Sequence, residues 1–339
     1  MDRLLVVLKR LTQALPTVFG IVVITFLLTR ALPGDPAAFF AGPAATPESI
    51  AQIRANLGLD QPLPVQFGRY LTELAQGELG DSMTTGQPVM QELLTRLPAS
   101  LELTLVALVL SLAIALPLGV LAAVRQDSWV DQLCRFVVTA GVSLPTFFTG
   151  LLLVYIFYFL LGWAPPPLGR LDILSLSPPH VTGFYLIDSV IDGDAAVFWS
   201  SLKQLALPAI TLALFTLAPL ARMTRAAMLQ SLSSDYVRTA RACGLSYPKV
   251  LRTYALRNAM LPVITTLGMV FSFSLGANVL VEKVFSWPGI GSFAIEALVA
   301  SDYAAVQGFV LAMALLFVAL NLGVDLLYTL VDPRVKIDG

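Results

Sequence analysis

The chain has 339 residues, of which 57% are hydrophobic and only 13% are charged. A soluble domain typically carries roughly 25% charged residues. This much apolar surface could not be hidden inside one water-soluble globule of this length. The same composition excludes an intrinsically disordered chain. We therefore expect a protein that crosses a membrane several times.

Side chains suited to catalysis or metal binding are few. The two cysteines, Cys134 and Cys243, cannot form a disulfide framework. The one histidine, His180, has no Cys or His nearby, which leaves little room for a metal site or for His-dependent catalysis. The sequence also contains no Gly-Lys dipeptide and hence no Walker A phosphate loop. We expect no catalytic residue, no metal and no bound cofactor on this chain.

Six uncharged runs approach the roughly 20 residues that a helix needs to cross a bilayer. The first run follows Lys9-Arg10 and is too long for the apolar core of a signal peptide, so we interpret it as an uncleaved anchor. The third run is long enough for a tilt or a re-entrant end. We therefore expect an all-α polytopic protein with six transmembrane helices, at 11–29, 103–124, 136–163, 204–221, 258–281 and 303–324.

The distribution of charge predicts the orientation. Six spans place both termini on one side, together with two connecting loops. That side carries 14 of the 21 Lys and Arg residues and only 6 of the 22 acidic residues. Cytoplasmic loops are enriched in Lys and Arg, so we expect both termini in the cytoplasm. The cytoplasmic segments are 1–10, 125–135, 222–258 and 332–339.

We expect four parts along the chain. The helical spacing of apolar residues at 50–57 and 65–74 predicts a small ordered extracytoplasmic subdomain between helices 1 and 2. The parts are 1–32 with the first transmembrane helix, 33–98 outside the membrane, 99–331 with five transmembrane helices and a cytoplasmic loop at 226–258, and the tail 332–339.

The cytoplasmic loop has the signals of two short helices. Asp235 is a good N-cap for two helical turns over 236–243, and Gly244 suits the left-handed position that ends a helix. Ser246 can cap a second helix, with Pro248 tolerated in its first turn. The chain then runs toward the fifth span. We expect a short helix that lies across the cytoplasmic face.

This helix would present small residues, Thr239, Ala240 and Ala242, between Arg238 and Arg241. Small side chains allow another surface to approach closely, and arginines can pair with its acidic groups. The pattern favours a docking helix. The alternative is a basic loop that only follows the charge rule for cytoplasmic segments.

At these residues the sequence resembles the EAA loop of bacterial ABC importer permeases. The loop motif is Glu-Ala-Ala, three residues, Gly, nine residues, Ile, one residue, Leu-Pro. Here 238–240 read Arg-Thr-Ala, Gly244 is in place, and Tyr254, Leu256 and Arg257 occupy the last positions. These departures are typical of the dipeptide/oligopeptide/nickel branch, and the chain looks most like its dipeptide permeases. Further segments similar to that branch are 32–36, 57–62, 77–82, 101–103, 182–188, 223–228, 285–291, 302–308 and 332–334.

The resemblance implies a type I ABC importer permease fold without an ATPase of its own. A second homologous permease would complete the translocation path, and an extracytoplasmic binding protein would deliver peptide. Two ATPase subunits would hold ATP and Mg and contact the cytoplasmic loop; nucleic acid is not an expected partner. Nickel chelates and glutathione-like molecules remain alternative substrates. The residues implied in ATPase coupling are Asp235, Tyr236, Arg238, Thr239, Ala240, Arg241, Ala242, Gly244 and Leu245.

Four residues are candidates for a pore or gate. Glu102 begins the second span and could meet a peptide amine, although a role at the helix N-terminus explains it equally well. Ser143, Pro145 and Phe147 mix polar and aromatic groups in the third span and could face the pore or pack against other helices. A proton-coupled transporter is the alternative of a different class; it predicts ionisable residues deep within several spans, where this chain has none.

Overall fold

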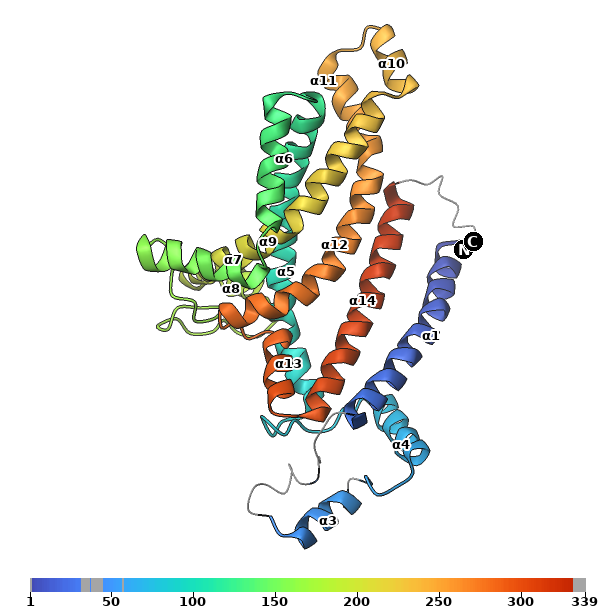
Figure 1. Ribbon diagram of the computed structural model, residues 1–339, viewed down its shortest axis with the longest axis vertical. Coiled ribbons are helices and arrows are strands. Elements are labelled where there is room, and N and C mark those ends of the chain that lie inside the picture. Colours follow the sequence, from blue (N-terminus) through green and yellow to red (C-terminus); the bar gives the residue numbers. More distant parts are fainter. Residues whose placement is uncertain (1, 32–36, 38–44, 57, 332–339) are drawn as a thin grey trace. The chain divides into compact units, whose positions relative to one another are not determined.

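The computed structural model describes residues 2–31, 37, 45–56 and 58–331. These residues form helices and connecting loops, and their only extended pairing is an isolated bridge between Asp81 and Pro88. The expected all-α fold is therefore confirmed for the described residues. The segment 32–36 and the tail 332–339, both named above, lie outside them. The helices (Figure 1) are α1 (Asp2–Ala31), α3 (Pro47–Asn56), α4 (Leu63–Ala75), α5 (Val89–Val124), α6 (Trp129–Val142), α7 (Thr146–Leu153), η1 (Val154–Leu160), α8 (Tyr185–Asp192), α9 (Ala195–Leu232), α10 (Asp235–Ala242), α11 (Tyr247–Lys249), η2 (Val250–Leu256), α12 (Arg257–Val284), α13 (Ile290–Val299) and α14 (Tyr303–Val331).

Helices occupy all six of the predicted spans, but not all of them meet the criteria for a membrane span by themselves. Within the described residues, four stretches are long and apolar enough: 89–124, 195–232, 247–284 and 303–324. A fifth is obtained if the bent pair α6 and α7–η1 counts as one span. The described part of α1 contributes a shorter apolar stretch, Leu15–Leu27. The two helices predicted from apolar spacing at 50–57 and 65–74 are present as α3 and α4.

The third run departs most from expectation. Its helix begins at Trp129, before the predicted start, and breaks at Ser143–Pro145 with a bend of 97° between α6 and α7. Pro145 is the residue that precedes α7, with an extended backbone (φ −56°, ψ 141°). Proline has no N–H for the helical ladder and disfavours a helical conformation in the residue before it, so the break occurs there. Beyond the bend, α7 continues into the π-helix η1.

The chain forms two compact units. One comprises Met1–Leu97 and Gly289–Val318, and the other Pro98–Pro288 and Ala319–Gly339. Residues 289–318 thus group with the N-terminal part of the chain. In the first unit, Ile290, Phe293 and Ala297 of α13 pack with the start of α5 and with α14.

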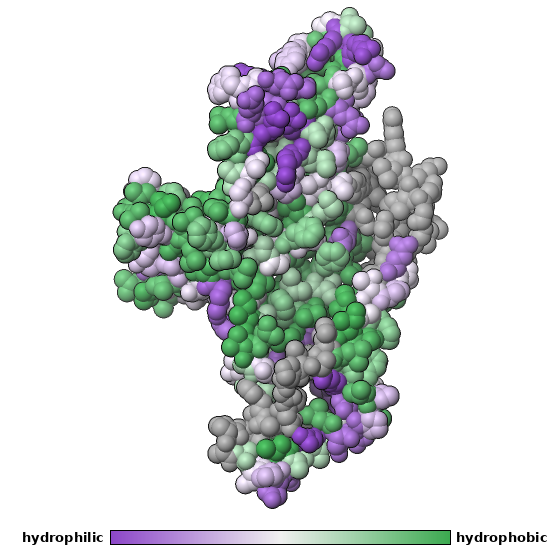
Figure 2. Space-filling model, viewed as in Figure 1, coloured by the Kyte–Doolittle hydropathy of each residue, from purple (hydrophilic) through white to green (hydrophobic). Residues whose placement is uncertain are grey.

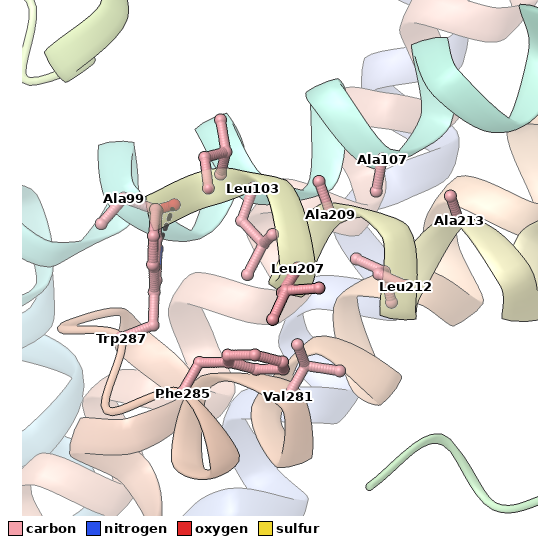
Figure 3. Close-up of a cluster of buried hydrophobic side chains, with 11 residues drawn as sticks. Ala99, Leu103, Ala107, Leu207, Ala209, Leu212, Ala213, Val281, Phe285 and Trp287 are labelled. Atoms are coloured by element: carbon pink, nitrogen blue, oxygen red, sulfur yellow. Dashed lines mark hydrogen bonds between the residues drawn. The ribbon is translucent and has the colours of Figure 1, made fainter. Parts of the chain in front are cut away.

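The second unit has its core where α5, α9 and α12 meet. Ala99, Leu103 and Ala107 of α5 face five side chains of α9, and Phe285 and Trp287 close the cluster (Figure 3). The Trp287 indole N–H donates a 2.9 Å hydrogen bond to the Ala99 carbonyl. Such a bond satisfies the polar end of a fully buried tryptophan. The α9 residues of this cluster are Leu205, Leu207, Ala209, Leu212 and Ala213.

Farther along, α5 and α9 approach each other closely. A Cβ at Gly119 would lie 2.5 Å from Cβ of Thr224, so no larger residue fits without movement of the helices. Small residues at helix contacts are typical of membrane proteins, where packing rather than water exclusion holds helices together. Along α9, this contact lies between the core residues 205–213 and the 235–257 loop that follows the helix.

Candidate functional site

The first element of the loop, α10, forms as two helical turns, as predicted. Its start differs by one residue, because Ser234 is the N-cap (φ −74°, ψ 154°) and Asp235 is the first helical residue. The prediction that Asp235 caps the helix was therefore wrong. Its carboxylate still lies at the positive end of the helix dipole, which it complements. The Ser234 hydroxyl does not cap either; it donates to the Ser231 carbonyl at 2.5 Å.

Gly244 ends α10 as predicted. Its φ is +74°, in the left-handed region that L-residues with a Cβ rarely adopt. The Gly244 N–H donates to the Arg241 carbonyl (3.0 Å) and the Leu245 N–H to the Ala240 carbonyl (3.3 Å). These two bonds form a Schellman motif, which satisfies carbonyls left free at the helix end. A Cβ at Gly244 would meet no atom within 4 Å, so the backbone angle, not space, selects glycine there.

One face of α10 is buried. Val237 and Ala240 are 0% and 5% exposed and pack with Met228 of α9, Val250 of η2 and further residues of η2 and α12. The prediction that Ala240 is presented to a partner was therefore wrong, because helical periodicity turns it inward with Val237. The cluster fixes α10 to the end of the long helices (Figure 1). Its other buried members are Ala123, Ala227, Ala255 and Ala259.

The opposite face of α10 is solvent-exposed and polar. Figure 2 shows hydrophilic side chains gathered over the part of the second unit where α10 and α11 lie. Arg238 contacts Asp235 at 3.3 Å, but these side chains are 79% and 93% exposed, so water screens the pair. Both arginines of α10 are therefore accessible to a partner. The exposed residues are Asp235, Tyr236, Arg238, Thr239, Arg241, Ala242 and Gly244, and Leu245 is half-buried.

The second predicted helix is also present, with one feature that the sequence did not predict. Ser246 has the extended backbone of an N-cap residue (φ −61°, ψ 143°), and Pro248 lies in the first turn of α11. The chain then passes through the π-helix η2 and continues as α12, with Pro262 inside the helix. π-Helical segments are rare and are frequent at functional sites. Here η2 packs against the buried face of α10 and continues directly into the membrane-spanning helix α12.

Glu102, a pore candidate, is only 4% exposed, and described residues engage both of its oxygens. It accepts a 2.6 Å hydrogen bond from Arg170 and a 2.9 Å bond from the Leu186 N–H. Arg170 also donates to the Gly183 carbonyl (2.8 Å) and lies 3.5 Å from the centre of the Tyr185 ring. The structure thus gives Glu102 an internal partner, and a contact with substrate stays a prediction.

A second carboxylate orders the same segment. Asp188 in α8 accepts hydrogen bonds from the Thr182 hydroxyl (2.6 Å) and from the N–H groups of Thr182 (2.8 Å), Gly183 (2.9 Å) and Val181 (3.4 Å). Burial by itself would raise the pKa of the Asp188 carboxyl. The hydrogen bonds lower this pKa by more than burial raises it, so the pKa lies below its ordinary value. These hydrogen bonds tie residues 181–183 to α8.

The other pore candidates lie together at the bend between α6 and α7. Ser143 ends α6 and donates from its hydroxyl to the Thr139 carbonyl at 2.8 Å. Ser143, Pro145 and Phe147 are all exposed. Within the described residues, no hydrogen bond or ion pair connects them to Glu102. Their role as a gate stays a prediction.

The sequence did not predict two buried polar clusters. Asp131 is fully buried and accepts two hydrogen bonds from Arg225 of α9, at 2.8 and 2.6 Å. Glu282, just beyond the predicted end of the fifth span, accepts hydrogen bonds from Ser100 (2.5 Å) and Asn278 (2.9 Å). The sequence signal for Asp131 was its position three residues after Ser128, the N-cap of α6. Nothing in the sequence pointed to Arg225 as its partner.

Comparison with known proteins identifies the family. Residues 1–104 match the N-terminal part of binding-protein-dependent transport system membrane components, and residues 115–337 match the binding-protein-dependent transport system inner membrane component. A probable D,D-dipeptide transport system permease protein, DdpB of Escherichia coli, is 46% identical over 95% of this chain and 94% of its own length. Two dipeptide or di/tripeptide permease proteins named DppB are similar over 97% of the chain: that of Alkalihalophilus pseudofirmus at 40% identity and that of Pseudomonas aeruginosa at 44%, covering 98% and 97% of their own lengths. The chain therefore belongs to the family of binding-protein-dependent transport system inner membrane components.

Proposed function

We propose that this chain is the permease subunit of an ATP-driven importer of dipeptides or other short peptides. The observation that carries the proposal is α10, a short helix that is exposed on one face and fixed by its other face to residues of α9, η2 and α12. When a partner displaces such a helix, the membrane helices packed against it are displaced as well. The family membership supports the transport role, and the relatives described as dipeptide permeases support the peptide class.

The proposed topology has six spans and both termini in the cytoplasm. The spans are α1, α5, the bent pair α6 and α7–η1, α9, the continuous helix 247–284, and α14. The excess of Lys and Arg in the segments next to α10 supports a cytoplasmic position for that helix. Residues 45–97 and 163–194 then lie outside, in a bacterial inner membrane.

In the proposed mechanism the energy comes from partner subunits. Two ATPases hold ATP and Mg, and α10 docks on one of them with Arg238 and Arg241 facing acidic groups. When the ATPases close, α10 moves with the α9, η2 and α12 residues packed on Val237. Rigid-body movement of this kind can switch the translocation path between inward-open and outward-open states. A second homologous permease forms the other half of the path, and a binding protein supplies peptide.

The substrate is proposed as a peptide because of the dipeptide permeases among the relatives. Nickel chelates and glutathione-like molecules are the alternatives within the same branch. Glu102, Ser143, Pro145 and Phe147 remain the proposed pore or gate residues. If Glu102 meets a peptide amine, it must do so in a state in which the Arg170 contact has opened.

Co-purification tests this function. A tagged chain, expressed with the genes beside its own, should retain an ATPase pair whose activity rises with peptide plus binding protein. Gly244→Asp places a carboxylate beside the exposed arginines and should reduce peptide transport at least tenfold while hydrolysis continues. Gly68→Asp is the matched control, because no atom lies within 4 Å of its Cβ position in α4. Peptide transport by vesicles with a proton gradient and without any ATPase would refute the proposal.

A further inference from the structure

The unit made of residues 1–97 and 289–318 contains a cavity of about 820 Å³. Its walls come from the end of α1, from α4, from the α4–α5 connection and from the start of α14. Pockets of roughly 300–1,000 Å³ with a few placed polar groups are typical of small-molecule sites. The charged groups of the wall show which ligand this cavity would accept.

Arg30, on the cavity wall, is held in a fixed orientation. Its Nε donates to Gln66 Oε1 (3.0 Å), its Nη1 donates to the Phe26 carbonyl (3.4 Å), and the guanidinium lies 3.6 Å from the centre of the Phe26 ring. Gln66 is fixed in turn by its own bonds to the carbonyls of Leu59 (3.2 Å) and Gln61 (2.9 Å). Every hydrogen-bond acceptor of Arg30 is neutral. Its positive charge therefore has no carboxylate partner among the described residues.

Two acidic side chains of the same wall are unpaired as well. Glu78 and Asp81, both in the α4–α5 connection, are exposed, and their carboxylates have no hydrogen bond or ion pair among the described residues. The wall contains a contrasting pair, Arg69 and Glu73, whose side chains are joined at 2.8 Å. The cavity thus combines one preoriented cation with two free anions, supplied by different elements of the chain.

We propose that this cavity binds a zwitterionic ligand, with its anionic group at Arg30 and its ammonium group at Glu78 and Asp81. Two sources supply this chemistry: a short peptide with free termini, and the headgroup of phosphatidylethanolamine. The peptide source rests on the proposed function, whereas the lipid source does not.

The peptide arm uses the intact complex in nanodiscs of phosphatidylcholine, without binding protein. Equilibrium binding is measured with radiolabelled dialanine, with its C-terminal amide and with its N-acetyl form. Arg30→Gln should weaken dialanine binding about tenfold, as expected for loss of a charge-assisted hydrogen bond, and should not change binding of the amide. Glu78→Gln with Asp81→Asn should weaken dialanine but not its N-acetyl form. Arg54→Gln in α3, outside the cavity, is the matched control.

The lipid arm purifies the complex from membranes that contain phosphatidylethanolamine and detects retained lipid by native mass spectrometry. Loss of retained phosphatidylethanolamine in Arg30→Gln, but not in Arg54→Gln, identifies lipid as the ligand. The inference is overturned if neither ligand binds or if Arg30→Gln and Arg54→Gln behave alike. If peptide uptake with the binding protein stays normal in that case, only this inference fails. Retained lipid without peptide-stimulated ATPase activity would overturn the proposed function instead.

Discussion

The Arg170 guanidinium donates a 2.6 Å hydrogen bond to the Glu102 carboxylate where the two side chains are only 6% and 4% exposed. Glu102 lies in α5, and Arg170 lies 68 residues later, in the loop that precedes α8. The pair therefore joins α5 to the long segment that connects η1 and α8, within the unit that contains residues 98–288. A buried ion pair costs desolvation of both charges, so its contribution is revealed mainly when one partner is removed.

Removal of either charge should destabilise the protein. Glu102→Gln leaves a buried guanidinium uncompensated, for which a loss of about 3–5 kcal/mol is typical. The free energy of unfolding in detergent, obtained by denaturant titration, measures the effect. The double variant Glu102→Gln with Arg170→Met should lose less free energy of unfolding than the sum of the two single variants. In the double variant neither charge remains, so no buried charge is left without a partner. Arg69→Gln, which breaks an exposed pair, is the control and should change stability by less than about 1 kcal/mol. Equal losses in Glu102→Gln and Arg69→Gln would show that the buried pair is unimportant.

Asp188 predicts a dependence of stability on pH. Its pKa in the folded protein lies below its ordinary value, because hydrogen bonds from 181–183 outweigh the effect of burial. The unfolded state therefore binds the proton more readily than the folded state does. The stabilisation is complete above the unfolded pKa of about 3.9 and is lost as the pH falls through the folded pKa.

The acid-unfolding midpoint measures this contribution. Asp188→Asn should lower stability at pH 7 and should make the remaining stability less dependent on pH below about pH 4. Asp192→Asn is the matched control in the same helix, because Asp192 is exposed and its carboxylate has no hydrogen bond or ion pair among the described residues. If Asp188→Asn and the unchanged protein lose stability in parallel as the pH falls, the assignment to Asp188 is wrong.

The local structure of the loop was predictable because its signals are local. Gly244 lacks a Cβ and can therefore adopt φ +74°, and Ser246 and Pro248 mark the next helix within a few residues. The helix start was off by one residue because Ser234 and Asp235 are both good N-caps, and sequence does not rank them. The inward turn of Ala240 follows from periodicity with Val237, three residues earlier, and could have been predicted.

The long-range pairs could not be predicted in this way. Asp131 and Arg225 are 94 residues apart, and Ser82 and Asp302 are 220 apart, so only the tertiary fold brings them together. Which of the prolines breaks its helix could not be predicted, for a different reason. A run of uncharged residues shows that a segment is apolar, but it does not show where a proline breaks it, and Pro208 and Pro219 lie within an unbroken α9.

Gly244 allows backbone strain to be separated from crowding. Alanine at this position would meet no atom within 4 Å but would hold a Cβ at φ +74°. A left-handed conformation costs on the order of 1–2 kcal/mol for a residue other than glycine. Gly244→Ala should therefore lower the free energy of unfolding by about that amount and increase hydrogen exchange in α10. Gly68→Ala, equally free of contacts but inside the helix α4, should stabilise by about 1 kcal/mol. The same sign of change at both positions would contradict the role of the backbone angle.

Asp302 should hold the 82–84 segment in place. One of its oxygens accepts hydrogen bonds from the Ser82 hydroxyl (2.6 Å) and from the N–H and hydroxyl of Thr84 (3.1 Å each), and the other accepts from the Ala305 N–H (3.1 Å). Asp302→Ala leaves these donors without their acceptor, at about 1–3 kcal/mol for each buried group, and also removes the N-cap of α14. Limited proteolysis should then cut the segment 82–88 at least several-fold faster. Asp60→Ala is the control and should leave the rate unchanged, because Asp60 is exposed and has no such bonds among the described residues.

Asp302→Asn should give an intermediate rate, because one oxygen remains to accept from one side only. A cleavage rate that is the same in all three variants would mean that the segment is held by its apolar contacts, with Val89 and Leu93 of α5 packed in the same unit.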